Sequence, residues 1–120
     1  NLENRIDSYF KTWSAGNLQA YKNHFHETAI IHYKSRYSGA FVKEELKQFI
    51  NNQELAIKSS EKMREFPLSK KIVIQGDTAD AIVRWKLVSQ DREDTGYDHF
   101  IWVKTKNGWK ILYLFFYFDK

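Results

Sequence analysis

Residues 106–118 have the sequence KNGWKILYLFFYF, a tight turn followed by a densely aromatic run. Asn107 and Gly108 both tolerate positive φ, which is typical of a two-residue β-hairpin turn. The run from Trp109 to Phe118 therefore predicts the last strand of a sheet. Apolar side chains occupy both of its alternating faces, whereas a strand with one wet face alternates apolar with polar residues. We therefore expect both faces of the sheet to be covered.

Three more strands are predicted upstream of this hairpin. They lie at about residues 66–74, 79–87 and 97–106, separated by a turn at 76–77 and a polar loop at 91–96. In the first of them one parity holds Phe66, Leu68, Ile72 and Ile74. Pro67 lacks an N–H group, which predicts that this strand starts at a sheet edge.

The N-terminal part of the chain has helical rather than alternating periodicity. A helix over about residues 2–14 is predicted by the apolar spacing of Leu2, Ile6, Tyr9, Phe10 and Trp13. Gly16 supplies its stop and Asn17 caps a short second helix with the stripe Leu18, Tyr21 and Phe25.

A short strand and a third helix complete the prediction. The strand is expected over Ala29–Tyr33, a polar loop over 34–41, and a helix from Val42 to about Lys58. The predicted fold is α+β: three N-terminal helices and a cone-shaped, curved antiparallel sheet around an apolar pocket, with residues 1–120 as one domain.

Composition limits the classes of function. The 120 residues include 17% aromatic residues and no cysteine, so disulfides, thiolate metal sites and a cysteine nucleophile are excluded. The net charge of +4 comes from interspersed charges of both signs, and no apolar stretch is long enough to span a membrane. We therefore expect a soluble protein with neither a nucleic-acid nor a membrane partner. The chain begins at Asn1, without Met, which suggests processing or trimming; the cytoplasm and export after signal removal both remain open.

Motifs for nucleotide, dinucleotide or zinc binding, and a serine-centred elbow, are lacking in the sequence. His24 and His26 are two residues apart and do not share a helix face. The sequence thus predicts neither a cofactor nor a metal.

Three local signatures resemble the nuclear-transport-factor-2-like (NTF2-like) superfamily, which includes ketosteroid isomerases and SnoaL-like proteins. They are residues 9–17 (YFKTWSAGN), 25–31 (FHETAII) and 106–111 (KNGWKI). In order and at this spacing they cover essentially the whole chain. The resemblance implies the cone-shaped fold, which hosts enzymes, ligand binders and assembly domains alike.

Comparison with the ketosteroid isomerases suggests candidate catalytic residues. Tyr9 stands seven positions before Gly16, and Asp98 opens an Asp-His-Phe sequence, both as in those enzymes. The resemblance implies that these two side chains donate hydrogen bonds to a developing oxyanion. Tyr33, with His32 beside it, occupies the position of the family's catalytic base, an aspartate.

Each candidate also has a purely structural interpretation. Asp98 is either a pocket carboxyl with a raised pKa or a carboxylate paired with Arg84 or Lys86 on the neighbouring strand. His32 is either a general base or an ordinary strand histidine. Tyr9 points into the pocket or is a core aromatic with a satisfied hydroxyl.

The aromatic residues are expected to divide between pocket and core. The predicted ligand-binding residues are Trp13, Trp85, His99, Phe100, Trp102, Tyr113, Phe115 and Tyr117. At least half of the aromatics must be plain core.

Three functions follow from these features. The first is a pocket for a hydrophobic, cyclic small molecule. The second is a cofactor-free isomerase, dehydratase or hydrolase in which Asp98 or His32 moves a proton and Tyr9 or Tyr33 stabilises the oxyanion. The third is an interaction module, because the apolar outer face of the sheet predicts a homodimer.

Overall fold

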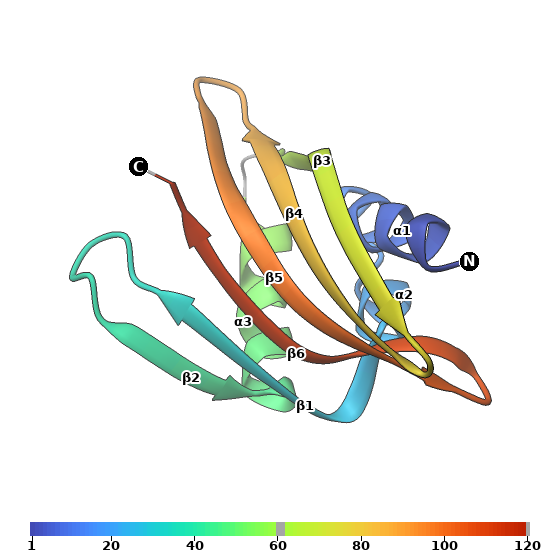
Figure 1. Ribbon diagram of the computed structural model, residues 1–120. Coiled ribbons are helices and arrows are strands. Elements are labelled where there is room, and N and C mark those ends of the chain that lie inside the picture. The colour runs from blue at the N-terminus through green and yellow to red at the C-terminus, as the bar shows by residue number, and fades with distance from the viewer. Residues whose placement is uncertain (60–61, 120) are drawn as a thin grey trace.

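The computed structural model describes residues 1–59 and 62–119, and a curved sheet with helices on one face dominates it (Figure 1). The helices are α1 (Leu2–Ser14), α2 (Leu18–Lys22) and α3 (Leu46–Ile57). The strands are β1 (Phe25–Lys34), β2 (Phe41–Glu45), β3 (Arg64–Gln75), β4 (Thr78–Val88), β5 (Glu93–Thr105) and β6 (Gly108–Phe118).

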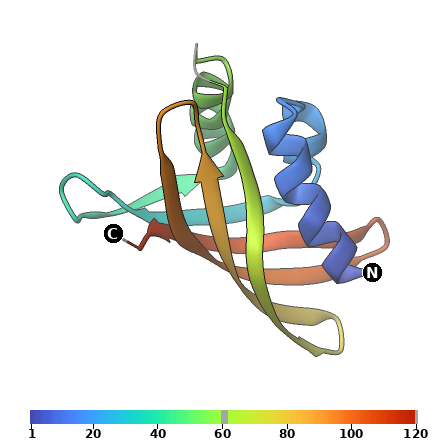
Figure 2. The same ribbon diagram turned by 90° about the horizontal axis from the view of Figure 1, so that it is seen from above.

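The strands lie in the order β2-β1-β6-β5-β4-β3. All neighbours are antiparallel except β1 and β6, which run parallel, so the sheet is mixed rather than purely antiparallel as expected. β3 is an edge strand, as Pro67 predicted. Figure 2 shows how the sheet curls, so that its concave side receives the helices.

The predicted bounds of α1 and the predicted start of α2 are confirmed, and a side-chain cap stands at the start of each helix. The Asn1 side chain accepts a hydrogen bond from the Asn4 backbone, and the Asn17 side chain does the same for Ala20. Gly16 adopts φ +73°, the left-handed conformation that glycine reaches without steric cost. The predicted apolar stripe of α1 is buried in full, which docks this helix on the concave face of the sheet.

Two predicted boundaries around β1 are wrong. Residues 41–45 form β2 instead of loop and helix, because they pair with β1 in an antiparallel hairpin, and α3 begins only at Leu46. β1 begins at Phe25, which the prediction had placed on α2. The neighbouring His24 carbonyl accepts a hydrogen bond from the Ile111 backbone of β6 (2.8 Å). The chain after α2 therefore joins the sheet instead of extending the helix.

Two β-bulges change which side chains face inward. The pairing of β3 with β4 skips Leu68, and the pairing of β5 with β6 skips Leu112. One extra residue in a strand inverts the alternation of every residue beyond it. Beyond Leu112, the outer face receives Tyr113, Phe115 and Tyr117, and the inner face receives Leu114, Phe116 and Phe118. The predicted shared parity of Phe66 with Ile72 fails for the same reason.

Candidate functional site

A small cavity lies between the concave face of the sheet and the helices. Its volume is about 140 Å³. We call it the inner cavity. Four of the predicted site residues meet in its wall: Tyr9 and Trp13 from α1, Trp85 from β4 and Asp98 from β5. The fold therefore brings the tyrosine of the first helix and the carboxyl of the penultimate strand to one cavity.

The remaining wall residues were missed by sequence reasoning: Gln53, Glu65, Leu87, Phe116 and Phe118. Simple alternation along β6 favours Tyr113, Phe115 and Tyr117 as the pocket residues, and the Leu112 bulge turns Phe116 and Phe118 inward in their place. Glu65 lies directly before the predicted start of its strand at Phe66. Glu65 pairs with Leu87 on β4, and this pairing places both side chains on the inner face.

Asp98 is buried, with only 4% of its surface exposed. Its Oδ1 accepts a hydrogen bond from the Trp85 indole N–H (3.1 Å). Burial raises its pKa well above the ordinary value, the nearby Glu65 carboxyl raises it further, and the Trp85 donor opposes the shift. The predicted alternative for this residue, an ion pair across the sheet, is wrong, since Arg84 pairs with Asp119 and Lys86 pairs with Glu93.

Two hydrogen bonds to Ser14 on α1 fix the backbone of Glu65. Its N–H donates to the Ser14 hydroxyl oxygen (2.8 Å), and that hydroxyl donates to the Glu65 carbonyl (3.0 Å). Burial raises the pKa of its carboxyl from 4.5 to about 8. Asp98 and Glu65 therefore titrate as an interacting pair, and burial raises the pKa of both carboxyls. Such a pair can donate a proton or a hydrogen bond into the cavity.

Tyr9 brings a buried hydroxyl to the wall of the inner cavity. Its oxygen lies 2.8 Å from the Tyr21 hydroxyl oxygen, so one O–H of the pair bonds the other. Burial is the main cause that raises the pKa of both phenols. Both stay protonated, and in the arrangement where Tyr21 donates, the Tyr9 O–H is left as a donor.

The inner cavity adjoins a larger cleft at the open end of the cone. This cleft, the vestibule, has a volume of about 580 Å³, and it shares Gln53, Phe116 and Phe118 with the inner cavity. On its wall the buried Glu44 carboxyl accepts a hydrogen bond from the Asn52 amide (2.6 Å). A small molecule entering from the vestibule therefore passes the two phenylalanines.

The two residues at the expected position of a catalytic base lie outside the inner cavity. Tyr33 lines the vestibule, with its ring stacked on Phe116 (5.4 Å between ring centroids). His32 faces the opposite side of the sheet, where its Nδ1 lies 3.1 Å from the Tyr113 hydroxyl. Ile31, the residue before His32 on β1, is completely buried on the inner face. Strand alternation therefore turns His32 outward.

The other predicted ligand-binding residues are also placed elsewhere. His99, Tyr113, Phe115 and Tyr117 lie on the outer face, because Asp98 and Leu114 take the inner positions. Phe100 and Trp102 face inward but are core: Phe100 packs edge-on against the Tyr9 ring, and Trp102 is completely buried.

The described part of the chain holds no group of three or more His, Asp or Glu side chains suited to a metal ion. Its helices are also too short and too polar to cross a bilayer.

Solved structures share this fold. A "putative dehydratase from the NTF2-like family" of Streptomyces avermitilis is 10% identical, with a TM-score of 0.82, over 99% of this chain and 94% of that one. An NTF2-like protein with a cystatin-like fold from Novosphingobium aromaticivorans is 13% identical (TM-score 0.74; 99% and 80% covered). An NTF2-like superfamily protein of Salmonella enterica is 17% identical (TM-score 0.78; 94% and 84% covered). The fold is therefore that of the NTF2-like superfamily.

A family model narrows this class. The model described as "Putative lumazine-binding" matches residues 1–117, so the chain belongs to that family. The comparison with curated proteins gives no match.

Proposed function

We propose that the protein binds a small cyclic molecule, with one ring in the inner cavity and the rest in the vestibule. The observation that carries this proposal is the pair of carboxyls, buried Asp98 and half-buried Glu65, in the wall of an otherwise mostly apolar cavity. Burying a polar group without full hydrogen bonding raises the free energy of the folded protein. A ligand that hydrogen-bonds to such a group lowers that free energy, which favours binding.

The size and chemistry of the inner cavity define the ligand class. A cavity of about 150 Å³ accommodates benzene, so the 140 Å³ here suits one ring. The family's description names lumazine, a fused heterocycle with lactam edges. A neutral carboxyl complements such an edge, because its O–H donates to the ring carbonyl while its C=O accepts from the ring N–H. Trp13, Trp85 and Phe118 supply aromatic surface for the ring.

The same carboxyl pair favours a second candidate, cofactor-free proton transfer. One neutral acid can protonate a departing or developing oxygen while its ionised partner removes a proton, which suits an isomerase or dehydratase. Tyr9 is the neighbouring oxyanion donor. In this scheme Asp98 and Glu65 move the protons, and His32, which faces away, takes no part.

A binding screen tests the pocket directly. Lumazine, aromatic acids, steroids and polyketide fragments are screened by thermal shift, and hits are measured by calorimetry. We expect Asp98→Asn and Tyr9→Phe to weaken the best hit at least about tenfold, because each removes a hydrogen bond to the ligand in a dry site. Asp80→Asn, an exposed carboxyl on the same strand as Trp85, is the matched control and leaves affinity unchanged. Equal affinity in all variants contradicts the proposal.

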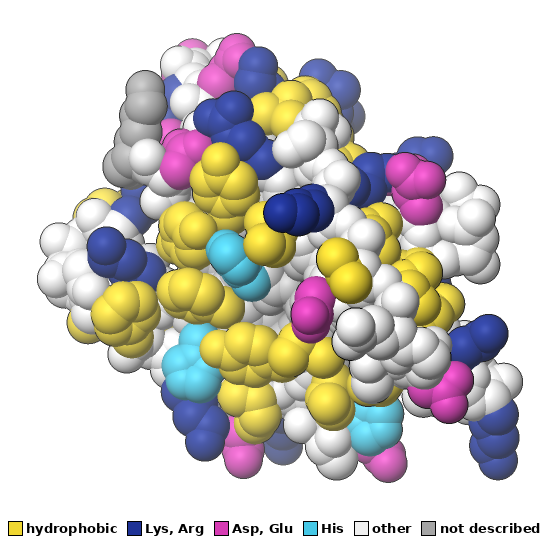
Figure 3. All heavy atoms as spheres, in the orientation of Figure 1, with side chains coloured by type: hydrophobic (Ala, Val, Ile, Leu, Met, Phe, Trp, Pro, Cys, Tyr) yellow, Lys and Arg dark blue, Asp and Glu magenta, His cyan; other side chains and the backbone are white. Residues whose placement is uncertain are grey.

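The outer face of the sheet supports a further role in assembly. Figure 3 shows apolar side chains gathered with histidine over the middle of this face. Tyr97, His99, Phe115 and Tyr117 form a continuous ring cluster there, closed by a hydrogen bond between His99 and Tyr117 (2.9 Å). Large exposed apolar patches mark interaction surfaces, and a second copy of the chain is the partner that we propose.

We expect Ile101→Glu to convert the dimer to a monomer. Ile101 pairs with Tyr113 on this face and is 38% exposed, so the charge is tolerated in the separate subunit but not in a buried interface. Light scattering at micromolar concentration measures the mass. Leu55→Glu on the exposed side of α3 is the control and keeps the dimer. A monomeric parent protein would refute the assembly.

A further inference from the structure

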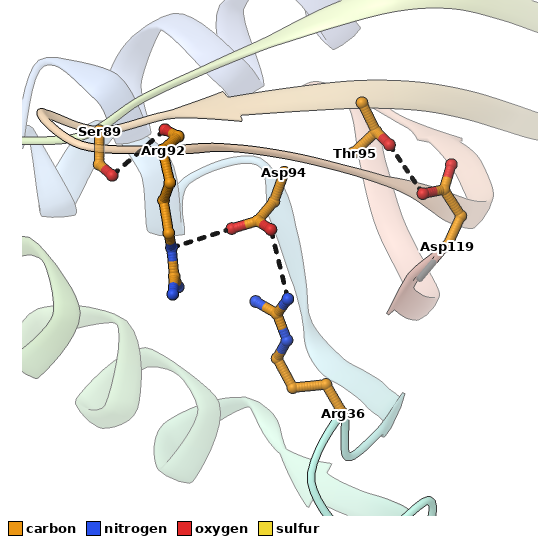
Figure 4. Close-up of polar contacts among 6 residues, drawn as sticks. All are labelled: Arg36, Ser89, Arg92, Asp94, Thr95 and Asp119. Atoms are coloured by element: carbon orange, nitrogen blue, oxygen red, sulfur yellow. Dashed lines mark hydrogen bonds and ion pairs between the residues drawn. The ribbon is translucent and has the colours of Figure 1, made fainter.

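Two arginines from separate segments converge at the mouth of the vestibule. Arg36 lies in the connection from β1 to β2, and Arg92 directly precedes β5. Asp94 lies between them: its Oδ1 accepts from an Arg36 terminal nitrogen (3.2 Å), and its Oδ2 lies 3.3 Å from Arg92 Nε (Figure 4). Both arginines line the vestibule, whereas Asp94 is not among its lining residues. The bridge therefore orients two guanidinium groups around one opening.

The local chain geometry fixes this arrangement. The Ser89 backbone N–H donates to the Arg92 carbonyl (3.0 Å), which closes the connection between β4 and β5. The Arg36 guanidinium carbon lies 4.0 Å from the centre of the Phe118 ring. Because Phe118 also lines the inner cavity, one cation sits at the boundary between the two spaces.

The charge of the vestibule is unbalanced. Lys34, Arg36 and Arg92 line it against a single carboxyl, Glu44, whose pKa is raised by burial. Among the described residues, the two terminal nitrogens of Arg92 have no side-chain partner. A guanidinium carries five donors in a fixed fork, so donors remain at the opening even while Asp94 is bound.

We propose that the vestibule is an anion subsite, and that the ligand of the proposed pocket is amphiphilic. A carboxylate or another oxyanion is held by Arg36 and Arg92, while the neutral ring passes Phe118 toward the inner cavity. This inference rests on the proposed pocket. Asp94 positions the two arginines. Its carboxylate also competes with the anion of the ligand for the two guanidinium groups, so it lowers the affinity for the anion.

A pair of fluorescent probes tests the subsite. Anilinonaphthalene sulfonate carries an anion, and N-phenyl-1-naphthylamine has the same ring system without it. Both are titrated against the full chain in an Ile101→Glu background, which disrupts the apolar outer face as a competing site for dyes. We expect Arg36→Gln and Arg92→Gln each to weaken the sulfonate about tenfold and the neutral dye less than twofold.

Two further variants separate an anion subsite from a structural bridge. Asp94→Asn removes a charge but keeps an acceptor, and it is expected to tighten the sulfonate severalfold. A merely structural bridge would make Asp94→Asn and the arginine variants change affinity in the same direction. Lys106→Gln, in the turn at the far end of the sheet, removes an equal charge and is expected to change neither dye.

The outcomes also distinguish the two proposals. Arginine variants that leave sulfonate affinity unchanged, or that weaken both dyes equally, overturn the anion subsite. Binding of the sulfonate that depends on the arginines, together with no binding of the neutral dye, supports the subsite and counts against the apolar pocket.

Discussion

Replacement of Glu65 by Gln is expected to stabilise the protein at pH 8 and to leave its stability near pH 4 unchanged. The folded-state pKa of Glu65 is about 8, against 4.5 for an ordinary glutamate. Below pH 4.5 the carboxyl is protonated in both the folded and the unfolded chain, so it does not change the free energy of unfolding. Between pH 4.5 and 8 the unfolded chain releases the proton while the folded chain retains it, so the free energy of unfolding falls as the pH rises.

The size of this effect follows from linkage. One pKa unit corresponds to about 1.4 kcal/mol, so the wild type loses up to about 4 kcal/mol across this pH range through Glu65. Asp98, whose pKa is also raised by burial, adds to the same trend. Urea unfolding at a series of pH values measures the free energy. Glu27→Gln, on an exposed side chain of β1, should retain the wild-type pH dependence. If Glu65→Gln retains it too, the Glu65 carboxyl is ionised in the folded protein at neutral pH.

Gly96→Ala is expected to destabilise the fold by roughly 3 kcal/mol. Gly96 lies in β5 opposite Phe118, and an added Cβ would overlap the Trp85 ring and the Tyr117 carbonyl. The indole cannot retreat easily, since it is buried and its N–H is bonded to Asp98. Relief of the overlap therefore disturbs the cavity wall as well as the core.

Chemical denaturation and tryptophan fluorescence test this expectation together. Gly39→Ala is the control, because its Cβ meets nothing within 4 Å and the change adds only the backbone strain of φ +75°. It should lose about 1 kcal/mol. A Gly96→Ala protein as stable as Gly39→Ala would show that Trp85 has room to move.

The candidate site was only partly predictable. Tyr9, Trp13, Trp85 and Asp98 lie on regular elements, where spacing defines the face, and the structure brings these residues to one cavity. Glu65 was missed because its role depends on Leu87, its neighbour across the sheet. Spacing along one strand carries no information about what lies beside it.

The amphipathic spacing of α1, the capping by Asn17 and the turn at Asn107-Gly108 determined their elements locally, because the responsible contacts lie within a few residues. The two faces of β6 were decided only by tertiary structure. Both faces are apolar, so hydrophobicity does not distinguish them, and the bulge at Leu112 sets their register through hydrogen bonds to β5. Those bonds lie between two strands, so the spacing of residues along β6 does not reveal them, and they decide which aromatic rings of β6 reach the cavity.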